Sequence, residues 1–205
     1  MAELPRLQAM AEDYGPRKFV MLALNAYDSQ ATIKTYQDLF PDVLMLMDPD
    51  WKIHDVYAQN GFIPLNYVIT PGQTVDYFEE GFDEAMVRSH IENLLPEVTV
   101  VLTPDVVTVP QGGTLSFDVD LVNWESSAQS FYALTEVEVP NGHTYTIMGP
   151  VPLTMNGNAQ ISTNLQHNVP VGTPLGMYTY TAKLGTGPPV ELMDVSIFTF
   201  EVVAP

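Results

Sequence analysis

The sequence of 205 residues contains no cysteine and only seven lysine and arginine residues. Without cysteine, these residues form no disulfide, offer no thiolate nucleophile and hold no cysteine-ligated metal, so dithiol chemistry is excluded for the chain as it stands. The seven basic residues are set against 25 acidic ones, which leaves a net charge of −18. A charge of that sign repels phosphate backbones and anionic membranes at long range, so nucleic acid is not expected as a partner.

Long hydrophobic runs are also missing. No apolar stretch approaches the roughly 20 residues that span a bilayer, and the beginning of the chain lacks the basic-then-apolar layout of a signal peptide. We therefore predict no membrane-spanning segment. The sequence does contain 46% apolar residues, which is enough for a hydrophobic core, in a length that fits one large or two ordinary domains.

The spacing of the apolar residues changes near Pro96. Up to residue 95, helical periodicity alternates with short continuous apolar runs, which is typical of an α/β domain. The continuous runs predict strands buried on both faces, whereas the more polar run at 74–78 predicts an edge strand. The predicted helices lie within 4–14, 29–40, 53–57 and 87–95, and the predicted strands lie at 19–24, 43–47, 65–69 and 74–78.

After Pro96 the hydrophobic period becomes two. Leu115, Phe117 and Val119 alternate with polar residues, as in a strand with one buried face. Turn-forming sequences such as 140–142 separate about seven strands of this kind. The pattern predicts two domains: an α/β domain over residues 1–95 and an antiparallel β-sandwich of immunoglobulin-like type over residues 97–205.

Three segments of the α/β region follow one another in a distinctive order: an aspartate-rich turn at 47–51, a helix that ends in Tyr57, and a Gly-Phe-Ile-Pro step into a strand at 61–69. In this order they resemble the second half of a thioredoxin-like redoxin, the superfamily of thiol-disulfide oxidoreductases and peroxiredoxins. The resemblance implies that the Ile63-Pro64 bond is cis. It also implies that Ile63 and Pro64 face the active site and bind an extended peptide substrate. From the residues alone, Pro64 could instead be a proline that only starts a strand.

The opening Glu3-Leu4-Pro5 resembles the residues that follow the Cys-x-x-Cys motif in secreted, reducing members of this family. Aligned in this way, the second cysteine would fall one position before Met1. The resemblance implies that Glu3 is the carboxylate that tunes the pKa of the dithiol. The alternative is that Glu3 is a first-turn acid, which is favourable to the helix dipole. No cofactor is expected.

The resemblance also implies a missing strand. In thioredoxin-like folds, the strand that leads into the Cys-x-x-Cys lies at the centre of the sheet, between the equivalents of 19–24 and 65–69. We therefore expect an incomplete domain that lacks its opening strand. Either the chain is a fragment of a longer product, or the neighbouring strands close up, or a second chain fills the gap by self-association. A late start codon, or an upstream UGA that encodes selenocysteine, would produce such a fragment.

Acidic residues at two places could bind a cation, but a structural role is favoured at both. Asp48 and Asp50 could act as ligands, although a solvated turn and a helix start are the preferred interpretation. In the sandwich, four acids are expected on the outward faces of neighbouring strands, as solvated surface rather than as a calcium site. These four are Asp118, Asp120, Glu136 and Glu138. We predict no metal site.

The histidines and the sandwich tryptophan identify no catalytic site. His54, His90, His143 and His167 show no metal-ligand spacing, and no Ser-His-Asp or Cys-His set can be argued. Trp124 and the tyrosines could line a carbohydrate site, although packing is the more common role for such residues.

The sandwich region resembles the immunoglobulin-like modules appended to many secreted bacterial enzymes, for example in Gly149-Pro150 and in Gly176-x-Tyr178-x-Tyr180. Together the two resemblances imply the C-terminal part of an exported thiol-disulfide oxidoreductase that acts on protein disulfides outside the cytoplasm. Without a cysteine of its own the chain is expected to be redox-inactive, and a single upstream peroxidatic cysteine would make the product a peroxidase. The alternative is a non-enzymatic extracellular adhesion, scaffold or carbohydrate-binding protein with a degenerate thioredoxin-like domain.

Overall fold

The computed structural model describes residues 3–58, 63–187 and 191–205. Internal contacts divide the chain into two units, Met1–Leu95 and Pro96–Pro205. The first is a small α/β unit and the second is a β-sandwich, so the predicted order of an α/β region followed by an all-β region is confirmed. Among the described residues, no helix is long and apolar enough to cross a membrane.

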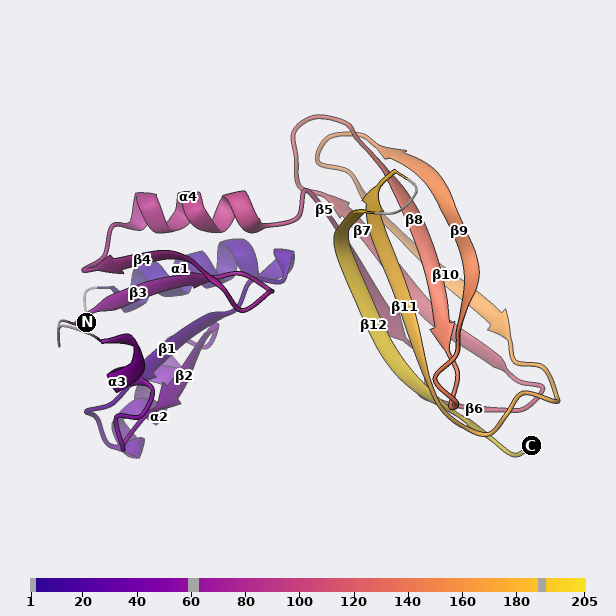
Figure 1. The fold of residues 1–205 in the computed structure, drawn as a ribbon, viewed down its shortest axis with the longest axis horizontal. Coiled ribbons are helices and arrows are strands. Elements are labelled where there is room, and N and C mark those ends of the chain that lie inside the picture. The colour runs from indigo at the N-terminus through magenta and orange to yellow at the C-terminus, as the bar shows by residue number, and fades with distance from the viewer. Residues whose placement is uncertain (1–2, 59–62, 188–190) are drawn as a thin grey trace. The chain divides into compact units, whose positions relative to one another are not determined.

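The described part of the α/β unit alternates helices and short strands in the predicted order (Figure 1). Its elements are α1 Leu4–Tyr14, the 3-10 turn η1 Gly15–Arg17, β1 Met21–Asn25, α2 Gln30–Leu39, β2 Val43–Met47, α3 His54–Tyr57, β3 Leu65–Ile69, β4 Val75–Glu80 and α4 Glu84–Leu94. Two helix starts follow directly from local sequence. The Ser29 hydroxyl caps α2 by accepting a hydrogen bond from the Thr32 amide, as the sequence suggested. The Asp83 carboxylate caps α4 in the same way.

The strands of the α/β unit form two separate pairs. β1 pairs with β2 in parallel, from Met21 opposite Val43 to Asn25 opposite Met47. β3 pairs with β4 in antiparallel orientation, and no described strand joins β1 to β3. One of the three outcomes expected for the missing strand was that β1 and β3 would pair with each other and close the gap. The described residues do not show this pairing.

The core of the α/β unit lies between α1, β3 and α4. Its buried residues are Met10 and Tyr14 from α1, Val68 from β3, and Val87 and Ile91 from α4. α1 and α4 are thus held together through one face of the β3–β4 pair. Burial of these side chains is the main favourable contribution to the stability of this unit.

The prediction that the strands at 19–24 and 43–47 are buried on both faces is wrong. Met21 of β1 packs against the core between the helices, but Leu22 and Leu24 are 54% and 40% exposed. Leu44 of β2 is exposed as well. Successive side chains of a strand point to opposite faces, so cover on one face alone leaves every second residue in solvent.

The second unit is a sandwich of two β-sheets (Figure 1). Its strands are β5 Val98–Pro104, β6 Thr108–Pro110, β7 Thr114–Asn123, β8 Gln129–Glu138, β9 Thr144–Met155, β10 Gln160–Asn168, β11 Gly176–Thr186 and β12 Glu191–Val203. One sheet has the order β10-β7-β5 and the other the order β6-β12-β11-β8-β9. β6 is parallel to β12, and the other pairs are antiparallel.

Aromatic and branched side chains from both sheets fill the sandwich. Phe117 of β7 lies against Tyr180 and Phe198 of the opposite sheet, with ring centroids 4.8 and 5.3 Å away. Polar contacts also join the sheets, because the buried Asp194 carboxylate of β12 accepts a hydrogen bond from the Val100 amide of β5 at 2.7 Å. The alternating pattern after Pro96 thus produces one continuous core between two sheets.

Candidate functional site

The candidate site in the α/β unit consists of two strand edges that have no strand partner among the described residues, and we call it the sheet gap. One is the edge of β1 opposite β2, and the other is the edge of β3 opposite β4. Exposed apolar side chains accompany these edges, including Leu22 and Leu24 on β1 and Ile69 on β3. Free main-chain groups beside apolar side chains are the features by which a sheet edge binds an added strand.

Ile63 and Pro64 lie directly before β3. The Ile63-Pro64 peptide bond is cis, as the family resemblance implied. The Pro64 carbonyl accepts a hydrogen bond from the Gly81 amide at 2.9 Å, which ties the start of β3 to the end of β4. The Ile63 side chain is exposed. Gly61 and Phe62, the first half of the same motif, lie outside the described residues, and the role of Ile63 and Pro64 in substrate binding stays a prediction.

Glu3 occupies the N-cap position of α1 rather than its first turn. Its carbonyl accepts hydrogen bonds from the Arg6 and Leu7 amides at 2.8 and 2.9 Å, but its side chain makes no capping hydrogen bond. A carboxylate at this end of a helix is favoured by the helix dipole. The role of Glu3 in tuning a thiol pKa stays a prediction.

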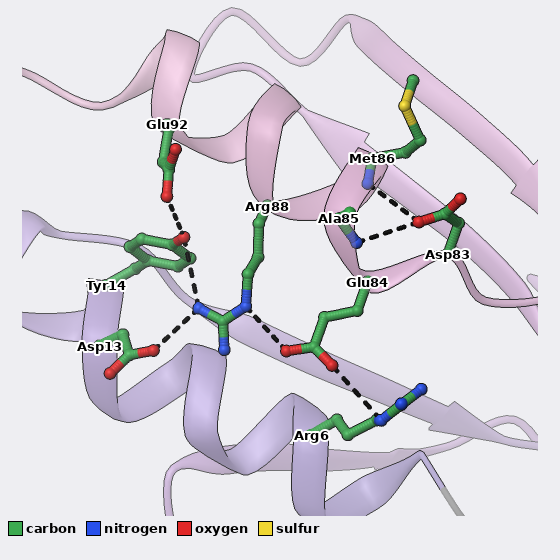
Figure 2. A network of polar contacts seen from close by, with 9 residues as sticks. All are labelled: Arg6, Asp13, Tyr14, Asp83, Glu84, Ala85, Met86, Arg88 and Glu92. Atoms are coloured by element: carbon green, nitrogen blue, oxygen red, sulfur yellow. Dashed lines mark hydrogen bonds and ion pairs between the residues drawn. The ribbon is translucent and has the colours of Figure 1, made fainter.

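A polar network joins α1 to α4, and the sequence reasoning did not identify it (Figure 2). Arg88 donates to the Asp13 and Glu84 carboxylates at 2.8 Å each and to the Tyr14 hydroxyl at 3.3 Å. Glu84 also pairs with Arg6 at 3.3 Å. The spacing of Glu84 and Arg88 on one helix was the only local signal of this network.

The contacts of the network raise the pKa of two of its members, Tyr14 and Arg88. Burial raises the pKa of Tyr14, and the 2.6 Å hydrogen bond that its hydroxyl donates to Glu92 raises it further. For Arg88, burial lowers the pKa, but the hydrogen bonds to Glu84, Tyr14 and Asp13 outweigh it and raise the pKa above its usual value. The network therefore joins α1 to α4 through hydrogen bonds and ion pairs.

Asp48 and Asp50 have structural roles. The buried Asp48 carboxylate accepts hydrogen bonds from the Ile53 and His54 amides at 2.9 and 2.7 Å, at the beginning of α3. Asp50 forms an exposed ion pair with Lys52 at 3.1 Å. The preferred interpretation, a turn followed by a helix start, is confirmed for Asp48. In the described ranges, no three histidine or carboxylate side chains come together in a way that could hold a metal ion.

The four acids of the sandwich do not lie on neighbouring strands, and this prediction was wrong. Asp118 and Asp120 belong to β7 of the three-stranded sheet, whereas Glu136 and Glu138 belong to β8 of the five-stranded sheet. An alternating pattern identifies a strand and its buried face, but it contains no information about which strands pair.

Two further side chains from the sequence analysis have structural partners. His90 of α4 contacts the Asp76 carboxylate of β4 at 2.8 Å. Trp124 donates through its indole Nε1 to the Thr99 hydroxyl at 2.9 Å. This contact is in line with a packing role for Trp124, as is usual for partly buried tryptophan.

A hollow of about 550 Å³ opens between α2 and β2. It is lined by Gln30, Ala31, Ile33, Lys34, Gln37, Met45 and Met47, so none of Glu3, Ile63 and Pro64 takes part in it. Gln37 is already engaged there, because its side-chain oxygen accepts a hydrogen bond from the Met45 amide at 2.9 Å.

No protein-family model matches the sequence, and no curated protein matches it. Several solved structures are similar. One is the CARDB domain of a Pyrococcus furiosus protein, solved in complex with di-metal ions; it is 18% identical, and the match covers 54% of this chain and 96% of that one with a TM-score of 0.42. Another is the sporulation control protein Spo0M of Bacillus subtilis, which is 13% identical over 54% of this chain and 51% of that one, also with a TM-score of 0.42.

A third similar structure is a β-glucosidase from Listeria innocua in complex with isofagomine. It is 11% identical, and the match covers 52% of this chain and 16% of that one with a TM-score of 0.39. The similarity in these cases is to β-sandwich domains of CARDB or immunoglobulin-like type, the architecture that residues 96–205 show directly.

Proposed function

We propose that the α/β unit is part of a thioredoxin-like thiol-disulfide oxidoreductase domain, the part that follows the reactive cysteine pair in sequence. The observation that carries the proposal is the sheet gap. Among the described residues, β1 pairs with β2 and β3 pairs with β4, and neither has a second strand partner, within one unit whose order of elements resembles that of a redoxin. The sheet would then be completed by a strand from outside residues 1–205.

The directions of the two edges specify the strand that would fit. In the view of Figure 1, β1 and β3 run in opposite directions. A single strand in the gap would therefore be parallel to β1 and antiparallel to β3. Such a strand would satisfy backbone groups of β1 and β3, which cost about 1–3 kcal/mol each when they are buried without partners. A second copy of the chain is the other source of a strand, and it would produce self-association.

The predicted site residues have defined roles in this proposal. The backbone at Ile63 and Pro64 would pair with an extended segment of a protein disulfide substrate, since it lies at the exposed start of β3. A dithiol preceding Glu3 would lie at the start of the first helix, where the helix dipole lowers the pKa of a thiol and the Glu3 carboxylate raises it. The sandwich would be an appended module of an exported protein.

A second candidate function is an extracellular adhesion or scaffold protein. It is favoured by one observation, namely that the 205 residues contain no cysteine. In this alternative, the α/β unit contributes only packing, and the sandwich provides the binding surface.

The coding sequence upstream of the Met1 codon separates the two candidates. The proposal predicts an in-frame Cys-x-x-Cys, with UGA allowed in place of one cysteine codon, preceded by codons for one apolar strand. The longer product should then catalyse reduction of insulin disulfides, and serine in place of both motif cysteines should abolish that activity while the fold is retained. Upstream DNA without such a motif, or a longer product without disulfide reductase activity, would support the scaffold instead.

A further inference from the structure

A cavity of about 270 Å³ lies inside the β-sandwich, and we call it the sandwich cavity. It is lined by side chains from both sheets and by the residues that follow β10. Its apolar and aromatic walls include Leu115, Val137, Ile147, Tyr178, Tyr180 and Phe200. Most of these residues are buried, but Ile147 on β9 is 45% exposed and is the most exposed of the six. A concave apolar site with an open mouth is the usual form of a small-molecule site.

The polar groups of the sandwich cavity are few and uncharged. Its lining contains no lysine, arginine, aspartate or glutamate. His167 Nε2 and the Tyr180 hydroxyl form a hydrogen bond of 2.9 Å, and the rings of these two residues stack. The Tyr178 hydroxyl already donates to the Pro174 carbonyl at 2.7 Å. Asn168 and Thr173 also line the cavity, and the Asn168 side-chain oxygen accepts a hydrogen bond from the Thr114 hydroxyl at 3.4 Å. The His167–Tyr180 pair is a polar feature that can select a ligand, because either partner has further hydrogen-bonding capacity.

Burial keeps this pair neutral. It lowers the pKa of His167 and raises the pKa of Tyr180. A charged ligand would lose its hydration and find no counter-ion among the lining residues, which makes its binding unfavourable. An uncharged ligand meets no such penalty.

We propose that the sandwich cavity binds a small, uncharged aromatic molecule with one hydrogen-bonding group, of about the size of indole. The size follows from the volume, because an apolar cavity of roughly 150 Å³ holds benzene, and 270 Å³ holds about eleven non-hydrogen atoms by proportion, enough for the nine of indole. The ring of the ligand lies among the side chains of Tyr178, Tyr180 and Phe200, and its polar group bonds to the His167–Tyr180 pair.

A titration with indole tests this site on the full chain of 205 residues. Backbone amide chemical shifts, followed up to about 5 mM indole, cover the affinity expected of a ligand of this size. We expect saturable shifts at residues of β9, β10 and β11 around the cavity. The absence of saturable shifts in this range would overturn the proposal.

Two tryptophan substitutions provide a matched pair. Ile147→Trp enlarges a side chain that lines the cavity and should weaken indole binding by at least about tenfold. Ile161→Trp is the control, since Ile161 on β10 is 47% exposed and does not line the cavity. It should leave the affinity within about twofold. Far-UV circular dichroism checks that both variants fold, and Ile147→Phe replaces the first variant if it does not. Equal affinity in the Ile147 and control variants would overturn the proposal.

The hydrogen bond is tested separately with 1-methylindole, which has the same ring but no N–H donor. The wild-type chain should bind indole more tightly than 1-methylindole. Tyr180→Phe keeps the aromatic wall and removes the hydroxyl, so it should reduce this preference. A preference that is absent in the wild type, or unchanged in Tyr180→Phe, would contradict the assigned role of the His167–Tyr180 pair.

Discussion

Asn123 is the last residue of β7, and its buried side chain joins two turns of the sandwich. Its Nδ2 donates to the Ser127 and Asn156 carbonyls at 2.9 Å each, and its Oδ1 accepts from the Glu125 amide at 3.0 Å. Nδ2 also donates to the Met155 carbonyl at 3.3 Å. Asn123→Ala removes all four hydrogen bonds, each of which contributes about 1 kcal/mol or less, and it leaves partly buried backbone groups without partners. We therefore expect the free energy of unfolding of the sandwich to fall by about 2–4 kcal/mol.

Guanidinium unfolding followed by tryptophan fluorescence measures this change. The sequence has two tryptophans, so the measurement is made in a Trp51→Phe background in which Trp124 alone reports on the sandwich. The control is Asn164→Ala, because Asn164 is exposed although its Nδ2 donates to Asp118 at 2.9 Å. It should change the free energy of unfolding by no more than about 0.5 kcal/mol. If Asn123→Ala is equally mild at an unchanged denaturant slope, the reasoning from buried hydrogen bonds is refuted.

Three further predictions follow from other contacts. At Gly157 a Cβ atom would overlap the Ser126 carbonyl oxygen, so Gly157→Ala should destabilise the sandwich by at least about 1 kcal/mol. The control is Gly172→Ala, whose Cβ meets open space and which should be nearly neutral in the same unfolding assay. Because burial lowers the pKa of His167 in the folded state, the unfolded state binds more protons as the pH falls below about 6.5. The free energy of unfolding should therefore decrease below that pH, and His167→Gln should reduce the decrease; an unchanged pH dependence would contradict this assignment. Arg88→Met breaks the contacts to Asp13, Glu84 and Tyr14, so it should lower the stability of the α/β unit by about 1–2 kcal/mol. The measurement is the thermal loss of the far-UV helix signal. If the variant melts like the wild type, the network contributes little to stability.

Features that depend on neighbouring residues in sequence were predictable. The order of helices and strands follows from hydrophobic spacing, and the Ser29 cap follows from its position before a helical stripe. The switch to a β-sandwich near Pro96 follows from the change of period. These signals are local because each is determined by the direction in which successive side chains point.

Features that depend on tertiary contacts were not predictable from the pattern. The apolar residues Leu22 and Leu24 indicate a strand, but their exposure depends on what covers that face. The contact of Arg88 with Asp13 joins residues 75 positions apart, and the pairing of His167 with Tyr180 joins different sheets. For the candidate site, the cis bond at Ile63-Pro64 was expected from the family resemblance, whereas the two separate strand pairs had to be observed in the fold.

Hydrogen exchange at single backbone amides tests the central claim, that the α/β unit takes up one more strand between β1 and β3. In residues 1–205, measured at a concentration at which light scattering shows a monomer, we predict fast exchange for the β1 and β3 amides that face the sheet gap and slower exchange for those paired with β2 and β4. In a longer product that carries the proposed opening strand, the gap-facing amides should become protected. Amides that are already protected in the 1–205 monomer, or that still exchange fast in the longer product, would contradict the account.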